Sequence, residues 1–359
     1  MLRTRHTPSA DWRDLPHDIP SGILLWWAEM SDAAVQDAAA ALRRRYPGVP
    51  IQGCSTAGIV EAGRLHSQGI LAAFWFLPEK ARALRIRARG LASEWTLARD
   101  LADTLGPAPT GPIIIMAEGL HLDGERLTRA LSEALPHAII TGGMAADGER
   151  FQRTVLLHDT EILTDGLVAM ALPPQLEAVS ATGCGWHAMG PPRTVTAAEG
   201  RLILELDDEP ALTLYARYLG PHAADLPASG HHFPLLVSAP GEAPVLRSLI
   251  AVDHQRHGLL FTTAIPEGST VQLMHASMVD VLNAARTAAA QIPQGSAAAL
   301  MVSCVARRHV LGPLAEDEPA EVAATLGIPM AGWYSYGEIA AAPCSFRNQT
   351  ICLTALRPR

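Results

Sequence analysis

Short apolar runs alternate with amphipathic stretches along most of the chain. Runs of strand length lie at 22–28, 49–52, 70–77, 83–88, 112–116 and 137–141. Apolar side chains recur at helical spacing over 33–45, 95–105 and 123–135. The two spacings are those of buried strands and of helices with one buried face. Their alternation predicts a mixed α/β (α+β) fold in which helices pack on mixed sheets.

Local signals predict how some of these elements connect. Residues 70–77 and 83–88 read as a pair of strands. Residues 154–158 and 167–172 read as a hairpin whose turn includes Asp165 and Gly166. Residues 1–20 are polar and contain prolines, so we expect an extended lead-in. A loop rich in Gly, Pro and His at 220–233 follows a helical pattern at 211–219.

The second half repeats the same kinds of pattern. Strands are expected at 201–205, 259–264, 270–274, 298–305, 330–331 and 348–356, and helices at 211–219, 277–291 and 320–326. We place a boundary at about residue 210, which gives a lead-in at 1–20 and domains at 21–209 and 210–359. A chain of 359 residues is long enough for two domains.

One internal repeat is visible. Three times a helix leads to a short apolar strand that ends in a glycine-containing turn, at 53–58, 142–147 and 332–337. Glycine lets a ligand approach the backbone, so turns repeated at strand ends predict a shared binding pocket. The alternative is that these glycines serve turn geometry alone, and the repeat does not choose between the two.

Composition narrows the function. The net charge is −8 and no basic run occurs, which argues against nucleic-acid binding. The chain has no uninterrupted apolar stretch of roughly 20 residues, so we expect no membrane span. The start has no apolar segment typical of a secretory signal. Five scattered cysteines without a CxxC spacing favour neither a disulfide framework nor a structural zinc site. We therefore expect a cytoplasmic protein.

Seven short motifs together resemble the FIST family, over roughly residues 20 to 356. They are Gly53-Cys-Ser-Thr-Ala-Gly58, Gly142-Gly-Met-Ala-Ala-Asp-Gly148, Gly190-Pro-Pro-Arg-Thr-Val-Thr196, Pro210-Ala-Leu-Thr-Leu-Tyr215, Leu300-Met-Val-Ser-Cys304, Gly332-Trp-Tyr-Ser-Tyr-Gly-Glu338 and Asn348-Gln-Thr350. Each motif alone is weak, whereas their order and spacing are specific.

The resemblance implies a sensory protein with FIST-N and FIST-C halves that are related to each other. It implies a small-ligand pocket between the halves and a report to a partner kinase or cyclic-dinucleotide enzyme, because the chain has no room for an output domain of its own. One branch of the family binds haem and senses nitric oxide, and a eukaryotic relative recruits substrates to a ubiquitin ligase. Family members usually carry His at the position of Arg347, which stays protonated and cannot be an ordinary metal ligand. Arg347 could instead pair with a carboxylate on the ligand.

The expected pocket combines the three turns with the start of the last strand. Polar side chains that converge on a pocket are typical of small-molecule recognition. The expected ligand-binding residues are Gly53, Cys54, Ser55, Thr56, Gly142, Gly143, Met144, Asp147, Gly332, Ser335, Tyr336, Glu338, Arg347, Asn348 and Gln349.

Three other functions stay open. A haem-based nitric-oxide sensor would use one axial histidine, with His187 and His309 as candidates. An enzyme would use Cys54, Ser55 or Glu338, but Ser55 is followed by two residues before Gly58 rather than by the single residue of a nucleophile elbow, so we favour a non-enzyme. A scaffold that recruits proteins would need no small ligand.

Overall fold

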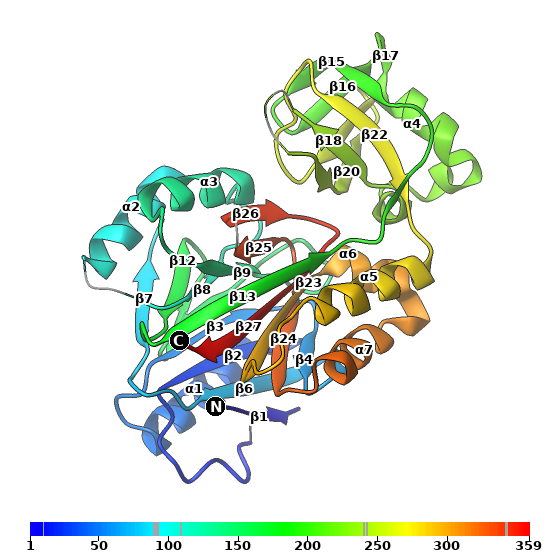
Figure 1. Ribbon diagram of the computed structural model, residues 1–359. Helices are drawn as coiled ribbons and strands as arrows, with labels where there is room; N and C mark the ends of the chain where they lie inside the picture. The colour runs from blue at the N-terminus through cyan, green and yellow to red at the C-terminus, as the bar shows by residue number, and fades with distance from the viewer. Residues whose placement is uncertain (10, 89–92, 108–109, 240, 242, 342–343) are drawn as a thin grey trace.

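Figure 1 shows the computed structural model, which describes residues 1–359 except 10, 89–92, 108–109, 240, 242 and 342–343. Within this part of the chain there are seven α-helices and four β-sheets. The predicted α+β class with mixed sheets is confirmed. Three of the sheets form a core, and the fourth belongs to a small domain.

The three core sheets share one strand order. The first contains β1 (Leu2–Thr7), β6 (Gly69–Trp75), β2 (Gly22–Ala28), β3 (Ile51–Ser55), β10 (Leu156–His158) and β11 (Glu161–Leu163). The second contains β7 (Arg82–Ile86), β12 (Leu167–Ala171), β8 (Ile113–Ala117), β9 (Ile140–Met144), β25 (Glu338–Ala341) and β26 (Cys344–Arg347). The third contains β13 (Leu176–Gly183), β27 (Ile351–Pro358), β23 (Ala298–Cys304), β24 (Met330–Ser335), β4 (Ile59–Glu61) and β5 (Arg64–His66).

Each sheet has a parallel pair of strands at its middle. The hairpin at one edge of each sheet follows the parallel pair of another sheet along the chain. The parallel pairs are β2–β3, β8–β9 and β23–β24. The hairpin after each pair leaves for a different sheet: β4–β5 joins the third, β10–β11 the first and β25–β26 the second. The core is therefore three repeats that each complete a neighbour.

Helices cover the outer faces of the core sheets. They are α1 (Asp32–Arg45), α2 (Glu94–Leu105), α3 (Gly124–Ala134), α5 (Met278–Ala290), α6 (Val305–Leu311) and α7 (Asp317–Leu326). In Figure 1, α2 and α3 lie together over the second sheet, and α5 and α7 lie over the third. Ser31 is the N-cap of α1 and accepts a hydrogen bond from the Ala34 N–H, which satisfies one free donor at the start of the helix.

Apolar side chains from all three sheets fill the centre of the core. Trp26 of the first sheet and Trp333 of the third stack with ring centroids 5.1 Å apart. Met116 of the second sheet belongs to the same buried cluster. Because protein interiors are packed as densely as organic crystals, this centre leaves no room for a ligand.

Residues 187–275, here called the small domain, form the fourth sheet. Its elements are β14 (His187–Ala188), β15 (Arg193–Glu199), β16 (Leu202–Leu206), β17 (Glu209–Pro210), α4 (Ala211–Leu219), η1 (Gly220–Asp225), η2 (Ala228–His232), β18 (Leu235–Ser238), β19 (Val245–Arg247), β20 (Leu249–Asp253), β21 (Gly258–Phe261) and β22 (Thr270–His275). Strands from both sides of residue 210 pair in this sheet. Figure 1 shows the small domain standing on the core, joined to it after β13 and after β22.

Several predicted connections are wrong. Residues 156–158 pair with 161–163, whereas 167–171 pair with both β7 and β8. Residues 70–77 and 83–88 supply strands of different sheets, β6 and β7, that do not pair. Residues 2–7 are not a lead-in, because β1 pairs along its whole length with β6. All three errors arise because local pattern does not say which sheet a strand joins.

The helices of the described residues include none that is both long enough and apolar enough to cross a membrane.

The Trp26–Trp333 stack yields a first prediction. Trp333→Ala removes a fully buried ring at the meeting point of the sheets, and we expect unfolding free energy to fall by about 3–5 kcal/mol. Urea denaturation of the full chain measures this loss. The control is Ile19→Ala, since Ile19 is 71% exposed and should change stability little. Equal stability of the two variants would contradict the packed centre.

Candidate functional site

The three glycine turns lie together at the carboxyl ends of the three parallel pairs. Backbone hydrogen bonds join each turn to the other two. They run from Ala57 N to Tyr334 O, from Tyr334 N to Gly58 O, from Met144 N to Gly337 O and from Ala146 N to Ser55 O, at 2.8–2.9 Å. The convergence expected from the repeat is therefore present.

The first turn begins in the packed centre. Cys54 is fully buried in the same cluster as Trp26, and burial raises the pKa of its thiol well above the ordinary value. A side chain on Gly53 would meet the Leu25 carbonyl oxygen at 2.3 Å. Gly332 is enclosed in the same way, because a Cβ atom added to it would lie 1.9 Å from the Met301 carbonyl oxygen. These glycines are needed because neighbouring strands approach closely.

The second turn is closed by its own backbone. The Asp147 carboxylate accepts hydrogen bonds from the N–H groups of Phe151, Gln152 and Arg153 and from the Tyr336 hydroxyl. A carboxylate with this many donors is fully satisfied. Asp147 and Tyr336 therefore hold the second and third turns together.

The third turn carries a buried carboxyl group that is only partly satisfied. Glu338 has no exposed surface, its Oε1 accepts a 2.8 Å hydrogen bond from Ser335, and its Oε2 has no hydrogen-bond partner among the described residues. Burial raises the pKa of Glu338 well above the ordinary value. This shift favours the protonated form, in which the carboxyl group can donate a hydrogen bond.

Cys304, the last residue of the Leu300–Cys304 motif, completes this group, although it was not among the residues expected in the pocket. It lies beside Ser335 in the parallel β23–β24 ladder. Burial, together with the charge of Glu338, raises the pKa of the thiol, so Cys304 stays protonated. A buried protonated thiol is a weak nucleophile, and this arrangement favours binding over covalent chemistry.

Asn348 and Gln349 connect the core to the small domain. Thr262 donates a 2.8 Å hydrogen bond to Asn348 Oδ1, and Gln349 Nε2 donates a 3.1 Å bond to the His231 carbonyl. Gln349 has a φ of +59°, a backbone conformation that residues other than glycine seldom adopt and that often marks functional positions. We call this contact between residues 346–350 and the small domain the seam.

Arg247 extends the seam toward α3. It is 3% exposed, forms an ion pair with Glu125 and lies 5.9 Å over the Phe346 ring. Burial lowers the pKa of Arg247, while the carboxylates of Glu125 and Asp123 counteract this effect. The small domain is therefore held to the core partly by buried charge.

Buried polar atoms without hydrogen-bond partners occur in several parts of the described chain, including the indole nitrogens of Trp26 and Trp333 in the packed centre. At the seam they are Arg347 Nε, Gln349 Oε1 and His231 Nδ1, with Glu338 Oε2 below it and Ser248 Oγ and Thr263 Oγ1 next in sequence to Arg247 and Thr262. Buried polar groups are nearly always hydrogen-bonded, and each exception needs an explanation. Donors and acceptors left open on both sides of one contact favour a polar molecule bound there.

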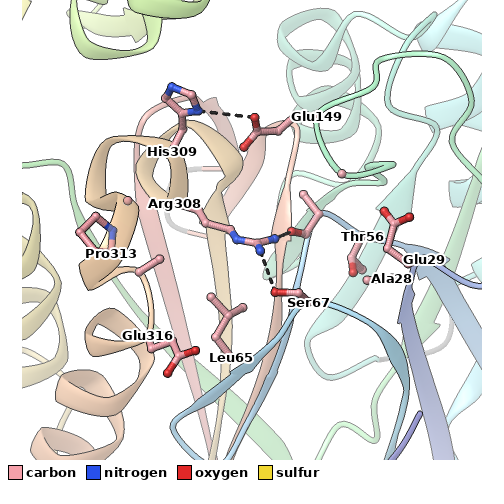
Figure 2. A pocket seen from close by; sticks show the side chains of 14 residues that line it. Ala28, Glu29, Thr56, Leu65, Ser67, Glu149, Arg308, His309, Pro313 and Glu316 are labelled. Carbon is pink, nitrogen blue, oxygen red and sulfur yellow. Dashed lines mark hydrogen bonds and ion pairs between the residues drawn. The ribbon is translucent and has the colours of Figure 1, made fainter.

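A separate cleft of about 790 Å³ opens beside the seam (Figure 2). Of the residues expected in the pocket, it is lined by Thr56. The Arg308 guanidinium crosses it and donates to Ser67 Oγ at 2.9 Å and to the Ala57 carbonyl. Three glutamates, Glu29, Glu149 and Glu316, also line it, so the cleft is acidic.

Three imidazoles meet where this cleft reaches the seam. The ring centroid of His309 lies 5.1 Å from that of His231 and 5.6 Å from that of His232. His309 Nδ1 lies 3.4 Å from Glu149, and this hydrogen bond raises the pKa of His309. Burial, together with the charge of His309, lowers the pKa of His231 to about 4. His231 therefore stays neutral at neutral pH, and a shared proton favours His309.

The two haem candidates lie in different surroundings. His309 is held by Glu149 through Nδ1 and lies against His231 and His232. The side chain of His187 is 61% exposed, and its Nε2 lies 3.5 Å from Asp280. Within the described residues, no group of three or more His, Cys, Asp or Glu side chains could hold a metal ion.

The predicted residues thus divide between several places. Ser335, Glu338, Arg347, Asn348 and Gln349 come together at or below the seam, with Gly142 and Gly143 paired to β25 behind them. Ser55, Thr56 and Asp147 line a different cleft of about 280 Å³. Met144 is buried, as are Gly53, Cys54 and Gly332. The small-domain side, His231, Arg247 and Thr262, was missed, although the unusual His231-His232 pair marked the right loop.

Comparisons with known proteins support the sequence motifs. The family model described as FIST N domain matches residues 23–209, and the FIST C domain model matches residues 211–341. Two similar relatives are the uncharacterized proteins Mb0898c of Mycobacterium bovis and Rv0628c of Mycobacterium tuberculosis. Each is 30% identical, over 62% and 59% of this chain respectively. The chain spans about 60% of the length of the curated relatives it matches.

Two buried glutamates give a matched prediction. Glu318 is ion-paired with the fully buried Arg307 at 2.6 Å, so Glu318→Gln should lower the unfolding free energy by about 3–5 kcal/mol. Glu338→Gln replaces a neutral carboxyl group and should cost less than about 1 kcal/mol. Chemical denaturation at pH 7 compares them. A larger loss for Glu338→Gln would show that Glu338 is ionised and paired.

The low pKa of His231 predicts acid sensitivity. Between pH 6.5 and about 4 the unfolded chain binds a proton at this position while the folded chain does not. Stability from neutral His231 is therefore present above pH 6.5 and is lost toward pH 4, by roughly 3 kcal/mol in total. The titratable groups that face His231 are His232, His309 and Glu149. The raised pKa of His309 stabilises the fold below pH 6.5, so the contribution of His309 stays constant while that of His231 is lost.

Urea titrations at half-unit pH steps measure this effect. His231→Gln should flatten the profile between pH 6.5 and 4, whereas the control His254→Gln should leave the slope unchanged. Parallel profiles for wild type and His231→Gln would contradict the assignment.

Proposed function

Because the chain belongs to the FIST family, whose domains are generally signal-transduction sensor domains, we propose that it is a signal-input protein that captures a small polar ligand at the seam. One observation carries this proposal. Gln349, Arg347 and His231 leave buried hydrogen-bonding atoms open where the small domain meets the core. A ligand that occupies these atoms replaces their lost hydration.

The seam also supplies a way to signal. The small domain joins the core through two chain segments, and its docking uses a few polar contacts, such as Thr262 to Asn348 and His231 to Gln349. A ligand that binds both sides favours the docked arrangement, because it gains contacts there that it lacks when the parts separate. A partner kinase or cyclic-dinucleotide enzyme then reads the docked state.

Hydrogen exchange tests this function. Protein purified from its own host is compared before and after removal of small molecules by partial unfolding and refolding. Residues 228–232 and 346–350 should exchange more slowly in the protein as purified, because the ligand stabilises docking. Native mass spectrometry of the same samples should show an added mass that disappears on stripping.

Variants localise the effect. Gln349→Ala should abolish both the added mass and the slower exchange, while Gln175→Ala, at an exposed position away from the seam, should preserve both. Identical exchange at the seam before and after stripping would refute the sensing proposal.

A further inference from the structure

The search for a ligand class begins with Arg347, which is half-buried at the end of β26. Its Nε is buried without a hydrogen-bond partner, and among the described residues no carboxylate lies within ion-pair distance of it. A guanidinium cannot relieve its burial by losing a proton. A cation in this position is costly unless an anion accompanies it.

Two buried arginines show the usual solution. Arg307 is paired with Glu318, and Arg247 is paired with Glu125. Arg347 lacks such a partner, and its charge is felt by Arg247, whose pKa it helps to lower. The seam therefore holds a positive charge without a counter-ion.

Glu338 does not fill the role of counter-ion. It is the cross-strand neighbour of Arg347 in the β25–β26 hairpin, yet its carboxyl group turns to Ser335 and forms no ion pair with Arg347. Burial also raises the pKa of Glu338, which disfavours its negative charge.

The open groups of the seam are mostly donors. Arg347 Nε and the hydroxyls of Ser248 and Thr263 can donate, whereas Gln349 Oε1 accepts because its amide nitrogen is used by His231. A ligand that matches them is rich in acceptors, carries a negative charge and presents one donor. We propose that the ligand is a small organic anion with a carboxylate, held by Arg347.

This inference rests on the proposed function, because it names the ligand class of the same site. A carboxylate fits the planar fork of a guanidinium with two parallel hydrogen bonds, and the ligand's own hydroxyl or N–H group donates to Gln349. Inorganic phosphate shares the negative charge and the acceptors but lacks the planar carboxylate. It therefore serves as a competing probe.

The experiment uses the full chain, stripped of small molecules, in a low-salt buffer without carboxylates. Melting temperature and calorimetric titration are measured with acetate, glycolate, malonate, inorganic phosphate, and the neutral glycolamide as a size match. We expect glycolate to raise the melting temperature most, acetate and malonate less, and glycolamide not at all. Stabilisation by glycolamide equal to that by glycolate, or by phosphate alone, would overturn the carboxylate assignment.

Variants at Arg347 separate binding from structure. Arg347→Gln should weaken glycolate binding by about ten- to a hundredfold, and Arg347→Lys should retain part of it through charge alone. In buffer without anions, Arg347→Gln should melt at the same or a higher temperature than wild type, because an uncompensated charge is gone. If Arg347 were only structural, this variant would melt lower in every buffer.

A matched control is Arg286→Gln, which removes an exposed arginine paired with Glu321 and should leave glycolate binding unchanged. Failure of every carboxylate to bind, with a seam that still responds to ligand removal in hydrogen exchange, would overturn the anion and leave the sensing function standing. Failure of both would overturn the two together.

Discussion

The exchange of hairpins between the three repeats is the constraint on which the rest of the structure depends. Each repeat sends its hairpin to another sheet and then returns to its own sheet for its last strand. In the third repeat this return passes through residues 348–350, between β26 in the second sheet and β27 in the third. The Asn348-Gln349-Thr350 motif therefore lies where two sheets meet, at the carboxyl ends of their parallel strands. Ligand sites of open α/β sheets commonly lie at this end.

The three repeats share a plan but differ in how they satisfy buried polar groups. In the first repeat the Ser55 hydroxyl accepts from the Val155 N–H, and in the second the Asp147 carboxylate accepts from three backbone N–H groups. In the third, Glu338 receives one hydroxyl and keeps an open oxygen. The third repeat is also the one that carries the small domain, inserted between β13 and α5. Of these three polar groups, only Glu338 of the third repeat keeps an unpaired oxygen, which supports the proposal that the binding site belongs to the third repeat.

Local pattern was enough to predict most of the core. The runs at 22–28 and 112–116 form buried strands, and residues 33–45 form α1. These elements could be predicted because burial of one or both faces sets the spacing of apolar residues along the sequence. The pattern did not reveal which sheet a short hairpin joins. The apolar spacing of β10 and β25 would be the same if each strand paired in the sheet of its own repeat. The turn glycines were predicted from their spacing, but their cause is close strand packing as much as access to a ligand.

The site was predicted in part for a similar reason. The Glu338 turn and the Asn348–Gln349 pair stood out in the sequence, whereas their partners could not, because Gln349 meets His231 across more than a hundred residues of chain. Cys304 was missed as a site residue because it ends an apolar strand, and nothing in the adjacent sequence indicates that a polar residue lies beside it in the fold. These contacts depend on how the small domain is set on the core, which no local pattern encodes.

The central claim is that the seam between the small domain and the core is a ligand site. A high-resolution crystal structure of the protein purified from its own host tests it most directly. The account predicts density for a small molecule within hydrogen-bonding distance of Gln349 and Arg347, with the open oxygen of Glu338 facing it. A seam in which side chains and isolated waters satisfy every one of these atoms would contradict it.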